Sequence, residues 1–100
     1  MKKHTPHYSL TAMQTAIAQA GRNAFTLTAI NGGRAMGLTD YDMLEVISNL
    51  NRADFHKSMT TYNNHRIWQD VYHAICPNRR IAYIKLTQIA ERVVIQFKEK

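Results

Sequence analysis

The stretch that decides the fold is Ile81-Ala82-Tyr83-Ile84-Lys85-Leu86-Thr87-Gln88, with the related stretch Arg92-Val93-Val94-Ile95-Gln96-Phe97-Lys98 just after it. Apolar and polar side chains alternate along both stretches, a period typical of β-strands that bury one face. The short connection at Ala90-Glu91 favours a reversal of direction. The two strands are therefore predicted to be antiparallel neighbours.

The alternation also predicts which side chains share a face. Apolar side chains line one face of this pair, namely Ala82, Ile84, Leu86, Val93, Ile95 and Phe97. The opposite face then displays Tyr83, Lys85, Gln96 and Lys98 to solvent. An aromatic hydroxyl among lysines could hold a phosphodiester, although an ordinary hydrated sheet face carries the same pattern.

Two further strands are expected upstream, at Phe55–Thr61 and Ile67–His73, with turns at Asn63-Asn64 and Cys76-Pro77-Asn78. Residues 1–54 have helical spacing instead. The first helix is predicted to begin with a capping box at Thr11-Ala12-Met13-Gln14 and to end at Gly21. Helices before an antiparallel sheet give an α+β fold, with three N-terminal helices packed on one face of the sheet.

The other two helices carry weaker signals. The segment Thr28 to Met36 is predicted to be helical even though it contains two interior glycines, each costing about 1 kcal/mol relative to alanine. A third helix is expected from Asp40, where Asp40, Asp42 and Glu45 suit the positive end of a helix dipole. We interpret these carboxylates as capping groups in preference to metal ligands.

Length and charge narrow the possible functions. One hundred residues suit a single domain over 1–100, with a helical half near 1–54 and a sheet half near 55–100. The net charge is +6, and residues 57–100 hold eight basic and three acidic side chains. A positive field concentrated in half of a domain favours a polyanion such as nucleic acid, although charge alone also fits a merely soluble basic protein. No run of about 18 apolar residues is present, so no membrane partner is expected.

Several chemistries lack their motifs. The chain has no phosphate-binding loop, no paired cysteines for zinc and no zincin spacing among its five histidines, so no metal or cofactor is predicted. The single cysteine, Cys76, fits a reducing compartment, and no apolar segment follows the charged N-terminus as in a signal peptide, so a cytoplasmic location is expected. His56 and His65 flank the first long strand and could meet across a hairpin as an acid–base pair, or they could be ordinary surface residues.

The block Phe55-His56-Lys57-Ser58-Met59-Thr60-Thr61-Tyr62, followed by Ile67-Trp68-Gln69-Asp70-Val71-Tyr72, closely resembles the MqsR family of bacterial toxins. The C-terminal Phe97-Lys98-Glu99-Lys100 and the N-terminal Thr5-Pro6-His7 are similar to the same family. The resemblance covers essentially the whole chain. It is looser in residues 22–38 and 73–80.

This resemblance implies a RelE-like fold and a type II toxin that acts as an mRNA interferase. Such an enzyme is an endoribonuclease that cuts single-stranded mRNA at selected sequences without the ribosome, with roles in growth arrest, stress response and biofilm formation. It implies neutralisation by an MqsA-like antitoxin with zinc-binding and helix-turn-helix modules, so DNA would be contacted only through that partner. The family's active-site positions fall on Lys57, Gln69, Tyr83 and Lys98.

These side chains suit metal-independent cleavage in which the neighbouring 2′-hydroxyl attacks the phosphate. The lysines can stabilise phosphorane charge, Tyr83 can orient phosphate or relay a proton, and Gln69 can hold ribose or phosphate. If Lys57 and Lys98 lie close together, their repulsion lowers at least one pKa. RNA contacts are expected from Tyr62, by stacking, and from basic groups along the backbone: Arg66, Arg79, Arg80, Lys85 and Lys100. Trp68 could stack on a base or be structural. The alternative from another class is a non-catalytic basic module that binds nucleic acid and regulates.

Overall fold

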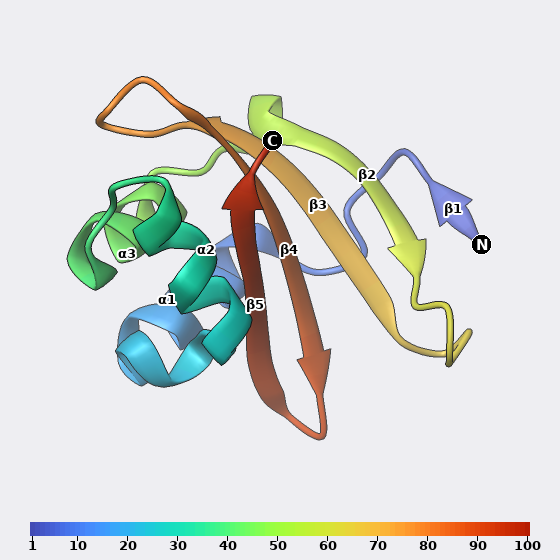
Figure 1. The fold of residues 1–100 in the computed structure, drawn as a ribbon. Coiled ribbons are helices and arrows are strands. Elements are labelled where there is room, and N and C mark those ends of the chain that lie inside the picture. Colours follow the sequence, from blue (N-terminus) through green and yellow to red (C-terminus); the bar gives the residue numbers. More distant parts are fainter.

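The computed structural model describes all residues from Met1 to Lys100 and consists of helices followed by a sheet (Figure 1). The predicted α+β class is confirmed, and so are the four long strands. The helices are α1 (Leu10–Ala20), α2 (Leu27–Ala35) and α3 (Asp40–Ser48), with 3-10 turns at Gly21–Ala24 and Arg52–Asp54. The strands are β1 (Lys2–Lys3), β2 (Phe55–Thr60), β3 (Trp68–Ile75), β4 (Ile81–Ile89) and β5 (Arg92–Glu99). No helix is long and apolar enough to cross a membrane.

The sheet has the strand order β1-β2-β3-β4-β5, and every neighbouring pair is antiparallel. The antiparallel pairing predicted from the short connections is therefore confirmed. Strand β1 was not expected, because two residues are too few to show a period. It pairs with β2 at one edge, while α2 lies beside β5 near the other edge (Figure 1).

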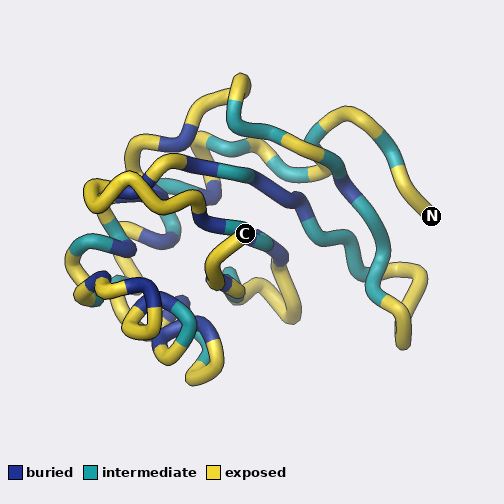
Figure 2. The backbone as a smooth tube through the Cα atoms, turned by 45° about the horizontal axis from the view of Figure 1, so that its top comes forward, coloured by how far each residue is buried: buried dark blue, intermediate teal, exposed yellow.

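A cluster of 20 buried residues joins the helices to one face of the sheet. Five of the six predicted inward positions of β4 and β5 belong to it, and the sixth, Val93, is partly buried against it. Ala82, Ile84 and Ile95 are fully buried. Figure 2 shows exposed stretches in the loops, at the chain ends and along the helices, and buried stretches in the strands and on the helices. We call this face of the sheet the inner face, and the opposite face the outer face.

Helix α1 begins two residues earlier than the sequence indicated. Its cap is Ser9, whose hydroxyl accepts a hydrogen bond from the backbone N–H of Ala12, so the predicted capping box at Thr11 is wrong. Gln14 does not reach back to its own helix. Its amide instead donates to the carbonyl oxygens of Ile47, Ser48 and Leu50, which closes the free C-terminal end of α3. Gly21 ends the helix as predicted, with φ of 60°.

Helix α2 forms despite its two glycines because both allow close packing. A Cβ atom at Gly32 would collide with the backbone carbonyl oxygen of Phe97, and one at Gly33 would collide with the side chain of Met43. Just before the helix, the backbone N–H of Thr26 donates to the carbonyl oxygen of Ile95 at 3.2 Å. Glycine therefore lets α2 press directly against β5, and this contact offsets the weak helix propensity.

Of the acidic residues at the start of α3, Asp42 acts as a capping group, as predicted, whereas Asp40 forms ion pairs. Thr39 and Asp42 form a reciprocal capping box, with both hydrogen bonds at 3.0 Å. Asp40 pairs with Arg22 at 3.3 Å and with Arg34 at 3.7 Å. These contacts fix the start of α3 against the segments around α2.

Candidate active site on the outer face of the sheet

Four adjacent strands carry the four predicted catalytic residues, and all four side chains belong to the outer face. Lys57 comes from β2, Gln69 from β3, Tyr83 from β4 and Lys98 from β5. The register explains this placement, because Lys57 pairs with Val71 and Val71 with Lys85 on the same face. The sequence places residues far apart in the chain on one surface through ordinary strand pairing.

Tyr83 and Lys98 are the pair of the four whose contact is direct. They lie directly opposite each other on β4 and β5, and the Lys98 Nζ atom is 5.4 Å from the centre of the Tyr83 ring. The alternation of the two strands had predicted that both side chains share this face. The contact gives the cluster a fixed cation beside an aromatic hydroxyl.

Lys57 and Gln69 are turned outward by a buried anchor on the inner face. Their neighbours in the chain, Ser58 and Asp70, are almost completely buried and paired, with the Ser58 hydroxyl donating to the Asp70 carboxylate at 2.6 Å. The same carboxylate accepts hydrogen bonds from the backbone N–H groups of His7 at 3.0 Å and Tyr8 at 2.8 Å. A buried carboxylate with three donors is satisfied, and it holds the register of β2 against β3.

Lys85 occupies the middle of the outer face, between the pair Lys57 and Gln69 and the pair Tyr83 and Lys98. Burial lowers the pKa of Lys85, and the positive charges of Lys98 and Lys57 lower it further. Below these amines Val71 is fully buried although it lies outside the core cluster, because outer-face side chains cover it. Lys85 therefore lies within the positive field of both Lys57 and Lys98.

A hollow of about 430 Å³ opens beside this cluster, where α2 stands against the edge of the sheet. Helix α2 forms its wall with Thr28, Asn31 and Gly32. Its other lining comes mainly from outer-face side chains, including Tyr83, Lys85, Gln96 and Lys98. Side-chain amide, hydroxyl and ammonium groups therefore line the same hollow.

The predicted RNA-contacting residues are divided between the two ends of the sheet, and Lys85 alone joins the catalytic cluster. Tyr62, which is 97% exposed, lies with Arg66 in the loop after β2. Arg79 and Arg80 lie in the loop between β3 and β4, at the opposite end (Figure 1). The Arg80 guanidinium pairs with Glu99 at 3.1 Å. Lys100 follows β5, and its backbone N–H donates a hydrogen bond to the backbone carbonyl oxygen of Ile81.

Residues near the N-terminus of the chain pack against Trp68. The His7 ring stacks on the Trp68 ring with centroids 5.1 Å apart, and the Lys3 ammonium lies 4.3 Å from the ring centre. The Tyr8 hydroxyl donates to the Trp68 carbonyl oxygen at 3.0 Å. These contacts give Trp68 a structural role in holding the N-terminal segment on the sheet.

The histidines are arranged differently from the predicted hairpin pair. His56 stacks on His73, with ring centroids 4.3 Å apart, and His65 lies in the loop after β2. His73 in turn lies 5.4 Å from Tyr83, its partner across the strands. The spacing of residues 69, 71 and 73 along β3 could have placed His73 on the outer face. No group of three or more His, Cys, Asp or Glu side chains is placed to hold a metal ion.

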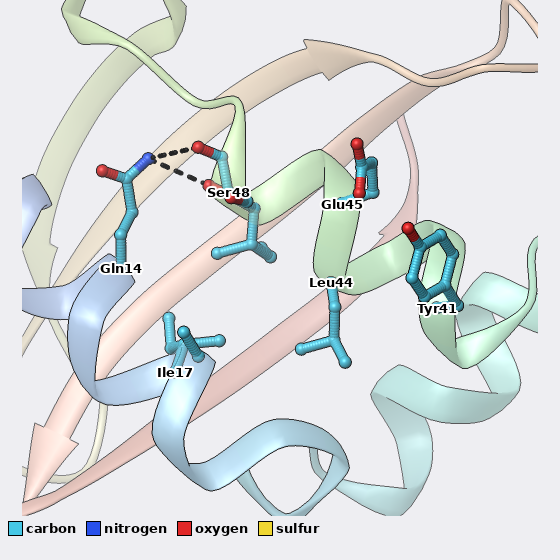
Figure 3. A pocket seen from close by; sticks show the side chains of 8 residues that line it. Gln14, Ile17, Tyr41, Leu44, Glu45 and Ser48 are labelled. Carbon is cyan, nitrogen blue, oxygen red and sulfur yellow. Dashed lines mark hydrogen bonds between the residues drawn. The ribbon is translucent and has the colours of Figure 1, made fainter.

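A second hollow lies between α1 and α3 (Figure 3) and is lined mainly by apolar side chains such as Ile17 and Leu44. Gln14 borders it while holding the last carbonyls of α3, as the dashed lines in Figure 3 show. Its one charged group is Glu45, so it offers no cation for a phosphate. Cations, an amide and an aromatic hydroxyl therefore converge on the outer face of the sheet and not in the hollow between α1 and α3.

Comparison with known proteins identifies a family. Residues 5–99 match the family described as "Motility quorum-sensing regulator, toxin of MqsA". The chain is similar to the mRNA interferase toxin MqsR of Escherichia coli (strain K12), with 39% identity over 100 residues that cover all of both chains.

Proposed function

Because the chain belongs to the MqsR toxin family, we propose that it is an mRNA interferase, an endoribonuclease toxin whose active site is the outer face of the sheet. The observation that carries the proposal is the convergence of Lys57, Tyr83 and Lys98 around Lys85, on one face that contains no carboxylate in its strands. Such a face attracts a phosphodiester and stabilises added negative charge on it.

The proposed reaction begins with attack by the 2′-hydroxyl on the adjacent phosphorus. The 2′-oxygen forms the new bond, the bond to the 5′-oxygen breaks, and the products end in a 2′,3′-cyclic phosphate and a 5′-hydroxyl. Lys57 and Lys98 hold the non-bridging oxygens, while Gln69 orients ribose or phosphate without titrating. Lys85 joins them, because an ammonium with a lowered pKa gives up a proton more readily near neutral pH.

The hollow against α2 is the proposed seat of one nucleotide of the substrate. Lys85 and Lys98 face a phosphate there, and the Asn31 and Gln96 amides can form hydrogen bonds with a base edge. Arg66, Arg79, Arg80 and Lys100 would follow the RNA backbone away from the hollow toward the two ends of the sheet. Tyr62 would stack on an unpaired base, worth about 1–3 kcal/mol.

The partners follow from the same family membership. We propose that a cognate antitoxin neutralises the toxin, that it carries zinc-binding and helix-turn-helix modules, and that this chain meets DNA only through it. The site of action would be cytoplasmic mRNA. The helices followed by an antiparallel meander agree in outline with the RelE-like fold expected for the family.

Incubation of the purified protein with single-stranded RNA, followed by mapping of both new ends, tests the function. We expect cleavage of naked RNA with a cyclic phosphate upstream and no loss of activity in EDTA. Lys57→Ala and Lys98→Ala should abolish most cleavage while Lys2→Ala, at an exposed lysine of β1, leaves it intact. Protection of the RNA without any cut would support the non-catalytic binding module, and loss in EDTA restored by magnesium would contradict the metal-independent route.

A further inference from the structure

In the proposed ribonuclease site, on which this inference rests, Lys85 can give up a proton, but no residue of the cluster is suited to accept the proton of the 2′-hydroxyl near neutral pH. Lysine amines and tyrosine hydroxyls ordinarily titrate at a pKa of about 10, whereas proton transfer is most effective when the carrier's pKa lies near the working pH. Gln69 does not titrate. A base for the 2′-hydroxyl must therefore come from a neighbouring group.

Two imidazoles stand beside the cluster. The His56 and His73 rings are stacked with centroids 4.3 Å apart and planes inclined by 25°. The His73 ring is also in contact range of Tyr83, with centroids 5.4 Å apart. The pair is therefore joined to the catalytic cluster through Tyr83 on one side, and through the chain neighbour Lys57 on the other.

A β-bulge brings His56 onto this face. The pairing of β2 with β3 shifts between Phe55 and Lys57, since Phe55 pairs with Tyr72 and Lys57 with the adjacent Val71. Without the extra residue, strict alternation would send the side chain before Lys57 to the inner face. Bulges are used next to active sites to redirect one side chain, and here the redirected side chain is an exposed imidazole.

The surroundings of His73 favour its neutral form. His73 faces His56 and Lys57 from β2, Tyr83 from β4 and Lys100 after β5, and none of these groups is an anion at neutral pH. Partial burial lowers the pKa of His73, and the charges of His56, Lys100 and Lys57 lower it further. The His73 Nε2 atom is buried without a hydrogen-bond partner, so His73 supports its neighbour while the exposed His56 ring is free to meet a substrate.

We propose that His56 is the catalytic base of the cleavage reaction and that His73 is the positioning residue that holds its ring. Neutral His56 takes the proton of the 2′-hydroxyl as the 2′-oxygen bonds to phosphorus. The bond from phosphorus to the 5′-oxygen breaks, and that oxygen takes a proton from the Lys85 ammonium. Water then carries the proton from His56 back to Lys85, which restores both groups.

The test is the pH dependence of RNA cleavage in His56→Phe, which keeps an aromatic ring for the stack but cannot accept a proton. We expect kcat to fall about 10²–10⁴-fold, the usual contribution of a general base, with KM nearly unchanged. The wild-type rate should fall as the pH drops through the imidazole range, and this acidic limb should vanish in the variant. Added imidazole should restore part of the rate of His56→Gly.

Two further variants separate positioning from folding. His73→Ala should lower kcat because it removes the platform under His56, and His73→Phe should recover most of the loss. His65→Phe, in the loop after β2, should behave as wild type. Melting curves and binding of RNA with a 2′-O-methyl group at the cut site should be unchanged in His56→Phe.

A His56→Phe enzyme that keeps the wild-type rate and its acidic limb would overturn the inference while leaving the ribonuclease function standing. Failure of His73→Phe to recover activity would refute the positioning role, because a proton on His73 itself would then be required. Wild-type protein that leaves RNA uncut would overturn the proposed function together with this inference.

Discussion

Replacement of Gly32 by alanine tests the contact that builds one wall of the candidate site. The added methyl group would point into the backbone carbonyl oxygen of Phe97, next to Lys98. Backbone in the middle of a paired strand cannot turn aside as a side chain can, so α2 must move away from β5. The substitution therefore acts on stability and on the hollow at the same time.

The expected size follows from two opposing effects. Overpacking costs about 1–3 kcal/mol, and a collision with backbone belongs at the upper end of this range. Alanine in place of a helical glycine returns about 1 kcal/mol. The net loss is about 2 kcal/mol, which for a domain of this size is a fall in Tm of about 8–16 °C.

Gly33→Ala is the matched control, because it lies in the same helix and gains the same helix propensity. Its added methyl group would meet the side chain of Met43, a flexible side chain that yields more easily than the Phe97 backbone. We expect its stability to stay within about 1 kcal/mol of the wild type. Thermal melting of the three proteins measures the difference, and RNA titration at a temperature where all are folded should show weaker binding only for Gly32→Ala.

Equal melting temperatures for Gly32→Ala and Gly33→Ala would refute this reasoning, because the two substitutions differ only in what the new methyl group meets. A Gly32→Ala protein that is destabilised but binds RNA normally would leave the α2–β5 contact standing. It would show that the hollow beside α2 is not used by the substrate.

Three other predictions concern the anchor and the charges of the outer face. Asp70→Ala leaves the Ser58 hydroxyl and two backbone N–H groups without their acceptor, and should lower the free energy of unfolding by about 3 kcal/mol or more in urea titrations; an unchanged midpoint would contradict the anchor. Lys98→Met removes a positive neighbour of Lys85, so the Lys85 pKa should rise in an NMR titration while cleavage falls about 10²–10³-fold. A stationary Lys85 pKa would mean that the two amines do not interact. The pKa of His73 is lowered in the folded state, so the unfolded chain binds a proton on His73 more readily. The contribution of His73 to the free energy of unfolding is therefore constant above the ordinary imidazole pKa of about 6.5, and it falls as the pH drops below that value. His73→Phe should show a shallower loss on acidification, and identical slopes would exclude the effect.

The local pattern of the sequence predicted the strands of the sheet well because each strand has one apolar and one polar face. It also placed Tyr83 and Lys98 together, and the pairing of β4 with β5 confirms that placement. The start of α1 was predicted wrongly because Ser9 and Thr11 are both suitable caps, and a local pattern cannot choose between them. The short strand β1 depends on its partner β2, which lies far along the chain.

The candidate site shows the limit of strand alternation as a predictor. The resemblance to the MqsR family supplied Lys57 and Gln69, and alternation then carries the outer face along β3 to His73. His56 could not be found in this way, since the bulge between Phe55 and Lys57 reverses the expected face. Nothing local in the sequence marks the bulge, so the sequence offers His65 as a partner of His56 across a hairpin, or surface positions for both, but not the stack with His73.

The lysines of the outer face repel one another, because like charges held on rigid strands destabilise the free protein. Lys85 bears part of this cost, as its lowered pKa records. A bound phosphodiester carries one negative charge and relieves some of the repulsion. The phosphorane carries more negative charge and relieves more of it, so the strain of the free protein favours the transition state over the ground state. On this argument the lysines contribute more to kcat than to RNA affinity, and a lysine-to-methionine series should reveal that division.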